Sequence, residues 1–265
     1  MRKIKIFSII LFICSAAIYI GCRIYADVMT DHTPPVISGG EDVIRVSVED
    51  PQEKLLEGMT AEDEHDGDVS DSLVIQEISE FDDEGKRTVH YAAVDDSGNV
   101  GYYSREMQYT DYQAPVFSLS APLRFPMGAG FNICEGISAS SVLDGDLTNK
   151  IKYTLDRAVS ATTTGTYQVE FRVMDSAGRT SYLTTELEVY DSTEERIQVE
   201  LSSYLVYLNV NDAFHPNDYF SGSDPEGELN IQSAVDTSKA GTYYADYWVT
   251  EGSLSGKSSL VVVVR

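Results

Sequence analysis

A block of nine residues occurs three times in the sequence and constrains the fold more than any other feature. Residues 165–173 read Gly-Thr-Tyr-Gln-Val-Glu-Phe-Arg-Val, and residues 241–249 read Gly-Thr-Tyr-Tyr-Ala-Asp-Tyr-Trp-Val. A third copy occupies residues 85–93. Apolar and polar side chains alternate within each copy, as in a strand that is buried on one face. The chain is therefore predicted to contain one strand-rich unit of about 80 residues in three copies.

Turn motifs flank these strands at similar spacing. The turn after the strand is Asp-Asp-Ser-Gly-Asn at 95–99 and Asp-Ser-Ala-Gly-Arg at 175–179. An acidic turn before it reads Asp-Gly-Asp at 66–68 and again at 144–146, with a degenerate form at 224–228. Short runs of Val, Ile, Leu, Tyr and Thr between Gly, Asp, Ser and Pro clusters predict a small β-sandwich for each unit.

The order of these motifs resembles the bacterial immunoglobulin-like surface domain that was first named from a pesticidal crystal protein. It is also similar to hyalin-type and cadherin-like repeats of bacterial envelope proteins. The resemblance covers about residues 33–190 well, and beyond them it depends on Gly241-Thr242-Tyr243 and the degenerate acidic turn. It implies tandem immunoglobulin-like domains on a bacterial surface, where such domains serve as stalks, adhesion modules or accessory units of enzymes.

The expected fold class is all-β, with three tandem immunoglobulin-like β-sandwiches after an N-terminal transmembrane helix. The repeats predict domains at residues 32–110, 111–191 and 192–265, the last of which is divergent. Tyr167 and Tyr243 stand where a tyrosine corner would bond back to the chain. Arg87 occupies this place in the first unit, so we expect no such device there.

Residues 1–31 are predicted to be a cytoplasmic stub, a transmembrane anchor and a short linker. Residues 6–22 carry no charge, three basic residues precede them, and Arg23 follows. This asymmetry places the N-terminus in the cytoplasm and everything from Asp27 onward outside the membrane. Cys22 follows Gly21, so a lipoprotein anchored at Cys22 is the alternative.

Charge and motifs narrow the function. The chain has 19 Lys and Arg against 43 Asp and Glu, a net charge of −24, which excludes nucleic acid as a partner. The four His lie in no catalytic motif, and the sequence has no nucleophile elbow, zinc-protease helix or phosphate-binding loop. We therefore expect no enzymatic activity.

Calcium is the candidate cofactor. Residues 62–68 contain five acids, and calcium binds six to eight oxygen atoms from carboxylates and carbonyls. The ion would stiffen the joint between the first two units. The alternative is that Asp-Gly-Asp only forms a turn. The candidate ligands are Asp63, Asp66, Asp68, Asp95 and Asp111.

Aromatic residues give a second candidate site. Tyr91, Phe171 and Tyr247 occupy the same position of the repeated strand and are predicted to be buried. Tyr244 and Trp248 fall on the opposite face and are the candidate contacts for a carbohydrate or a protein. The alternative is that they pack on a neighbouring unit.

Together these features predict a non-catalytic, membrane-anchored cell-surface protein that serves as a stalk or as an adhesion and interaction module. Its partners would be the cytoplasmic membrane and a cell-surface protein or polysaccharide. The alternative is a calcium-stabilised carbohydrate- or protein-binding module whose binding head is the third domain.

Overall fold

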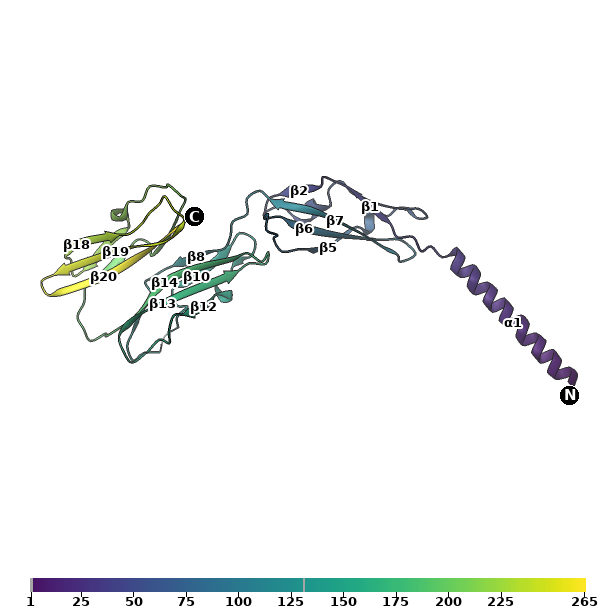
Figure 1. Cartoon of the computed structure of the whole chain (residues 1–265), viewed down its shortest axis with the longest axis horizontal. Helices are drawn as coiled ribbons and strands as arrows, with labels where there is room; N and C mark the ends of the chain where they lie inside the picture. The colour runs from purple at the N-terminus through teal and green to yellow at the C-terminus, as the bar shows by residue number, and fades with distance from the viewer. Residues whose placement is uncertain (1, 131) are drawn as a thin grey trace. The chain divides into compact units, whose positions relative to one another are not determined.

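The structure of the chain, a computed structural model, describes residues 2–130 and 132–265 (Figure 1). It confirms the all-β fold class: one N-terminal helix precedes three β-sandwiches. The chain divides into two compact units, residues 1–111 and 112–265. The first unit contains the helix and one sandwich, and the second unit contains two sandwiches.

Helix α1 runs over Arg2–Met29, and its segment Ile6–Tyr25 is long and apolar enough to cross a membrane. The large apolar side chains of this segment are exposed, with Phe12 at 72%. The basic side chains before Ile6, on which the predicted orientation depends, lie outside the described part of the structure. Twenty helical residues measure about 30 Å, the thickness of the hydrocarbon core of a bilayer.

Each sandwich pairs a four-stranded sheet with a smaller one. In the first sandwich the small sheet has the order β1-β3-β4 and the large sheet the order β2-β7-β6-β5. Strand β2 is parallel to β7, and the other strand pairs are antiparallel. The strands are β1 (Val36–Gly39), β2 (Val43–Val46), β3 (Met59–Asp63), β4 (Gly67–Asp68), β5 (Val74–Ile78), β6 (Arg87–Val94) and β7 (Val100–Tyr109). Two 3₁₀ helices, η1 (Gln52–Leu56) and η2 (Ser70–Ser72), lie between them.

The second sandwich repeats this topology strand for strand, with sheets β11-β10-β8 and β12-β13-β14-β9. Strand β9 is parallel to β14, as β2 is to β7. Its elements are β8 (Val116–Leu119), β9 (Arg124–Pro126), β10 (Ile137–Ser141), β11 (Gly145–Asp146), η3 (Thr148–Lys150), β12 (Lys152–Leu155), β13 (Gly165–Met174) and β14 (Thr180–Tyr190).

The third sandwich has the sheets β15-β17 and β16-β20-β19-β18, and β16 is parallel to β20. Its acidic turn is the degenerate one, and β17 is the only partner of β15 among the described strands. Its elements are β15 (Gln198–Leu201), β16 (Leu205–Leu208), η4 (Pro216–Tyr219), β17 (Phe220–Asp224), β18 (Glu228–Ser233), β19 (Gly241–Glu251) and β20 (Leu254–Val264).

The cores follow the alternation in the repeated strand. Tyr91, Phe171 and Tyr247 are each 0% exposed at the centre of their sandwich, as predicted. The hydroxyl groups of the two tyrosines find backbone acceptors: Tyr91 donates to the Leu55 carbonyl at 2.8 Å and Tyr247 to the Pro216 carbonyl at 2.6 Å. Buried hydroxyl groups need such partners, because an unpaired one costs stability.

The predicted hydrogen bonds of Tyr167 and Tyr243 to the upstream backbone are present, and an arginine makes a similar contact in the first sandwich. Tyr167 accepts a hydrogen bond from the Ser160 N–H at 3.0 Å, and Tyr243 donates to the Lys239 carbonyl at 3.1 Å. The first sandwich has no tyrosine at this place, because Arg87 occupies it. The Arg87 guanidinium donates from Nε to the Ser79 carbonyl at 2.5 Å, because a long cationic side chain reaches the same upstream backbone.

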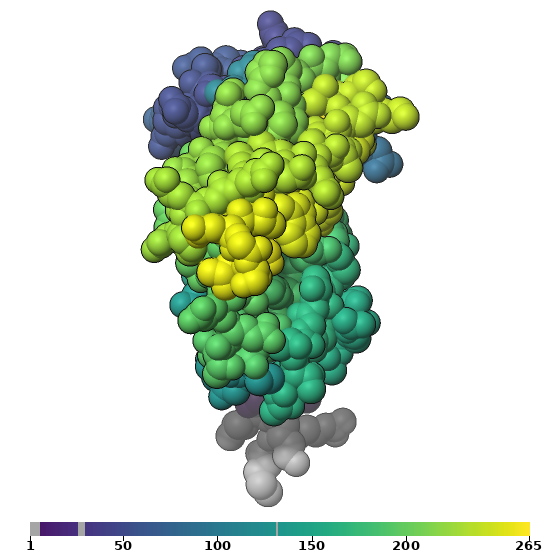
Figure 2. All heavy atoms as spheres, turned by 90° about the vertical axis from the view of Figure 1, so that its left-hand side faces the viewer, coloured from purple at the N-terminus to yellow at the C-terminus, as the bar shows by residue number. Residues whose placement is uncertain are grey.

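The second and third sandwiches share a core. Leu205 and Val261 of the third sandwich are buried in the same hydrophobic cluster as the core of the second. We call the interface between these two sandwiches the seam. Hydrogen bonds cross it from the Phe117 N–H to the Tyr207 hydroxyl at 2.9 Å and from the Tyr244 hydroxyl to the Thr184 carbonyl at 3.1 Å. In the space-filling view the yellow atoms of the C-terminal strand lie directly against green atoms of the second sandwich (Figure 2). The third sandwich is thus part of a two-domain body.

Candidate functional site

Four aspartates come together at one end of the first sandwich. Asp63 ends β3, Asp66 lies in the turn that leads to β4, and Asp95 opens the turn after β6. Asp31 lies in the segment between α1 and β1. One carboxylate oxygen from each of the four residues lies within 4.8 Å of those of the other three, and we call this group the acidic cluster.

The backbone of the two turns holds these carboxylates in place. Oδ1 of Asp63 accepts the N–H groups of His65 at 2.8 Å and of Asp66 at 3.1 Å. Oδ2 of Asp66 accepts the Asp96 N–H at 3.0 Å, which joins the two turns. Gly67, at φ +75°, provides the left-handed conformation that the acidic turn requires.

Asn99 connects the linker to the second turn. Its side-chain amide donates to Oδ2 of Asp95 at 2.7 Å and to the backbone carbonyl of Asp31 at 3.1 Å. The Thr33 N–H donates to Oδ1 of Asp31 at 2.9 Å, and this bond holds the pKa of the Asp31 carboxyl below its usual range. Asp63 and Asp95 are only 7% and 6% exposed, whereas Asp66 is exposed, so the cluster reaches from the interior to the surface.

Three of the five predicted metal ligands, Asp63, Asp66 and Asp95, belong to the acidic cluster. Asp68 does not belong to it. Its carboxylate accepts hydrogen bonds from Ser70, which lower the pKa of Asp68 and cap the turn that follows it.

Asp111 also lies outside the acidic cluster. It accepts hydrogen bonds from the Ser47 hydroxyl at 2.5 Å and the Val48 N–H at 2.9 Å, beyond the far end of β7. A ten-residue strand spans about 33 Å, so Asp111 and the turn that precedes β7 lie at opposite ends of the sheet. The linker acid that joins the cluster is instead Asp31, which lies one repeat before Asp111 in the sequence. Sequence reasoning missed Asp31, although the repeat spacing would have pointed to it.

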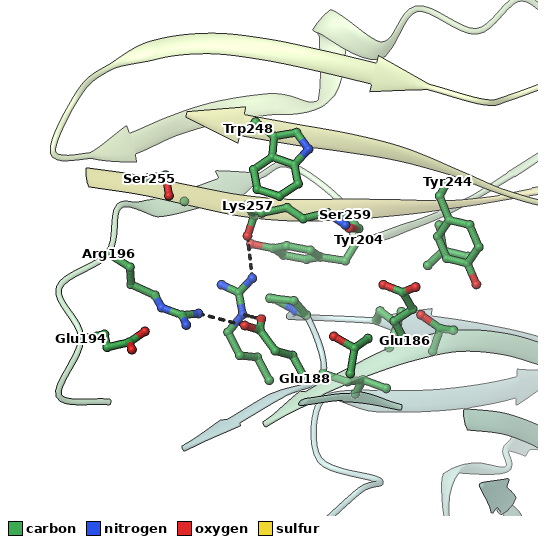
Figure 3. Close-up of a pocket in the computed structure, with 18 of the residues that line it drawn as sticks. Glu186, Glu188, Glu194, Arg196, Tyr204, Tyr244, Trp248, Ser255, Lys257 and Ser259 are labelled. Carbon is green, nitrogen blue, oxygen red and sulfur yellow. Dashed lines mark hydrogen bonds and ion pairs between the residues drawn. The ribbon is translucent and has the colours of Figure 1, made fainter. Parts of the chain in front are cut away.

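The second candidate site is a cleft of about 460 Å³ in the unit formed by residues 112–265 (Figure 3). Its walls come from both sandwiches. The third sandwich supplies three aromatic side chains, Tyr204, Tyr244 and Trp248. The second sandwich and the loop after it supply four acids, Glu186, Glu188, Glu194 and Glu195.

Ion pairs organise the floor of the cleft. Glu188 forms ion pairs with Arg124 at 2.6 Å and with Arg196 at 3.3 Å. Arg124 also donates a hydrogen bond to the Lys257 carbonyl at 2.5 Å, which joins the two sandwiches (Figure 3). The Lys257 ammonium lies 5.4 Å above the Trp248 ring. These contacts fix the aromatic wall relative to the acidic wall.

Both predicted contact residues, Tyr244 and Trp248, line this cleft. Trp248 is 38% exposed, and burial raises the pKa of the Tyr244 hydroxyl to about 12. The sequence did not indicate the acidic wall opposite them, because Glu186 and Glu188 belong to another repeat and meet the aromatic residues only through the seam.

The chain was compared with known proteins. No protein-family model matches it, so the resemblance to the bacterial immunoglobulin-like surface domain stays a prediction. An uncharacterized 81.3 kDa protein of Acholeplasma phage L2 is 25% identical over 171 residues, which are 62% of this chain and 23% of that protein. The chain thus spans less than a quarter of the length of this relative.

Several solved structures are also similar. One contains CBM51-2 in complex with GlcNAc and the INT domains of ZmpB from Clostridium perfringens, at 21% identity over 56% of this chain and 26% of that one, with a TM-score of 0.23. Another is a lipoprotein from Bacteroides thetaiotaomicron, at 12% identity over 56% and 98% of the two chains, with a TM-score of 0.24. A third is Drosophila N-cadherin EC1-4, at 14% identity over 71% and 59%, with a TM-score of 0.23.

Proposed function

We propose that the chain is a non-catalytic, membrane-anchored surface module. The observation that carries this proposal is the exposed apolar surface of α1. Phe7, Leu11 and Phe12 are exposed by 68%, 61% and 72% on a helix as long as a bilayer core is thick. Such a surface is favourable in lipid and costly in water. The helix anchors the chain, and the sandwiches that follow it form an outward-facing stalk.

The orientation follows from the flanking charges. Three basic residues precede the apolar segment and one follows it, so the N-terminus stays in the cytoplasm and the sandwiches lie outside. Lipid attachment at Cys22 is the alternative anchor, and it would place the same sandwiches on the same side of the membrane.

The cleft favours a second, more specific role, which is binding of a polysaccharide. Aromatic faces such as those of Trp248 and Tyr244 pack on the apolar faces of sugar rings, and carboxylates accept hydrogen bonds from sugar hydroxyl groups. The cleft sets these two kinds of wall opposite one another (Figure 3). The binding head is then the whole unit of residues 112–265, because each sandwich supplies one wall.

Binding to a panel of bacterial cell-wall and host oligosaccharides tests this role, with the full chain held in lipid nanodiscs. Trp248→Ala is expected to weaken binding about 30-fold, because truncation of a central aromatic contact costs about 2 kcal/mol. Tyr182→Ala is the matched control, since Tyr182 is a 59% exposed aromatic on β14 that does not line the cleft. The role is contradicted if the wild-type chain binds no glycan saturably, or if Tyr182→Ala weakens binding as much as Trp248→Ala.

A further inference from the structure

The second sandwich contains an altered copy of the acidic cluster, in which Asp63 is replaced by a serine and the linker acid bonds elsewhere. The turn geometry is the same in both copies. The Leu143 N–H donates to the Ser141 hydroxyl at 3.1 Å, and the equivalent bond in the first sandwich runs from His65 to Asp63. The Ser176 N–H donates to Asp144 at 2.8 Å, and its equivalent runs from Asp96 to Asp66. By position in the repeat, Asp31, Asp63, Asp66, Asp95 and Asn99 correspond to Asp111, Ser141, Asp144, Asp175 and Arg179.

The second sandwich supplies its own donor and its own positive charge at this place. Oδ2 of Asp175 accepts a short hydrogen bond, 2.6 Å, from the Tyr112 hydroxyl. Arg179 occupies the place that Asn99 has in the first sandwich, and its guanidinium interacts with the Tyr112 hydroxyl. Burial and the Asp175 carboxylate raise the pKa of Tyr112, and the charge of Arg179 opposes that rise. The acids that remain here are therefore matched by protein groups.

The first sandwich has no such match for two of its carboxylate oxygens. It has four carboxylates and a neutral Asn99 in the same arrangement. Among the described residues, nothing bonds Oδ2 of Asp31 or Oδ2 of Asp63, and both atoms are buried. The Asp63 residue and the Asp31 side chain are each only 7% exposed. A buried carboxylate oxygen without a partner is strongly unfavourable, and four adjacent carboxylates repel one another.

We infer that the acidic cluster binds one calcium ion through Asp31, Asp63, Asp66 and Asp95. Calcium–oxygen distances of about 2.3–2.6 Å allow ligands on opposite sides of the ion to lie about 5 Å apart, so one ion can contact oxygens that all lie within 4.8 Å of one another. Four carboxylates, each able to bind through one or two oxygens, suit the larger, more flexible shell of calcium better than the rigid octahedron of magnesium. Nδ1 of His65 lies 3.3 Å from Oδ1 of Asp31, but calcium prefers oxygen to imidazole nitrogen, so we assign His65 no ligand role.

The ion would fix the segment that joins the anchor to the first sandwich. Asp31 lies two residues after Met29, the last residue of α1, whereas the other three ligands belong to the turns of the sandwich. Calcium therefore ties this linker to β3 and β6. This inference goes beyond the anchoring and binding roles proposed above and does not depend on either.

Thermal unfolding of the full chain in nanodiscs, with calcium, magnesium or chelator, tests the inference. Calcium at 100 times its Kd is expected to raise the Tm of the first sandwich by about 10–20 °C, and magnesium by much less. Asp63→Ser installs the residue of the second sandwich and is expected to abolish the calcium response. Asp96→Ser is the matched control, because it makes the corresponding change to Ser176 and removes an exposed charge outside the cluster.

A variant that replaces the ion by a fixed positive charge keeps the test informative if Asp63→Ser does not fold. Asn99→Arg places a guanidinium where the second sandwich has one, and it is expected to raise the Tm in chelator and remove the calcium response. Hydrogen exchange supplies a second readout, since calcium is expected to slow exchange at residues 31–33 and 96–99 but not at 176–179. The inference is overturned if wild-type chain shows no calcium-specific rise, if Asp96→Ser removes the response, or if His65→Ala abolishes it.

Discussion

Phe171→Ala is expected to lower the free energy of unfolding of the second sandwich by about 3–5 kcal/mol, a large part of the 5–15 kcal/mol that stabilises a typical domain. The Phe171 side chain is 0% exposed on β13 and contacts the ring of Tyr153 at 6.3 Å between centroids. Its removal leaves a cavity that the interlocked strands can close only in part. Urea unfolding, followed by hydrogen exchange that resolves each sandwich, measures the loss.

The shared core determines how this loss is distributed. Leu205 and Val261 pack in the same cluster as Phe171, so the third sandwich should unfold at a lower urea concentration in the variant as well. The first sandwich has a separate core around Tyr91, and its transition should stay unchanged. Tyr153→Ala, at a 46% exposed position against the same ring, is the milder control. A loss below about 1 kcal/mol for Phe171→Ala, or an equal loss in the first sandwich, would contradict this description of the cores.

The double substitution Phe12→Asp with Ile13→Asp is expected to release the chain from the membrane. Both side chains are exposed near the middle of the apolar segment, at 72% and 59%. Each aspartate at the centre of a spanning helix costs about 2.5–3.5 kcal/mol, so the pair raises the cost of insertion by about 6 kcal/mol. The measurement is the share of the chain that sediments with membranes after alkaline carbonate washing.

Phe12→Leu with Ile13→Leu is the matched control, because it keeps the length and apolar character of the segment. The control should sediment like the wild-type chain. Equal sedimentation of the aspartate variant and the control would show that α1 is not what holds the chain to the membrane.

The repeat made much of the fold predictable. A strand pattern with period two, present in three copies at nearly equal spacing, fixes which side chains enter each core, and Tyr91, Phe171 and Tyr247 are buried as predicted. The seam could not be predicted in this way. Val261 lies in a continuous valine run, where the pattern does not show that this residue faces another sandwich.

The candidate sites show a similar limit. The two turns that carry Asp63, Asp66 and Asp95 are local motifs, and their meeting at one end of the sandwich follows from the topology. Which linker acid joins them depends on whether the chain enters or leaves the sandwich at that end. Asp31 lies where the chain enters the first sandwich, at the end with the two turns, whereas Asp111 lies where the chain leaves it, at the opposite end of β7. Only the strand order reveals this difference.

The central claim is that one membrane helix holds the sandwiches outside the cell, and external proteolysis of intact cells tests it most directly. The chain carries an N-terminal epitope tag, and the cells are treated with a protease that cannot cross the membrane. The account predicts that residues 32–265 are degraded on intact cells while a short tagged fragment containing α1 stays protected in the membrane fraction. Sandwiches that survive on intact cells and are degraded only after lysis would contradict it.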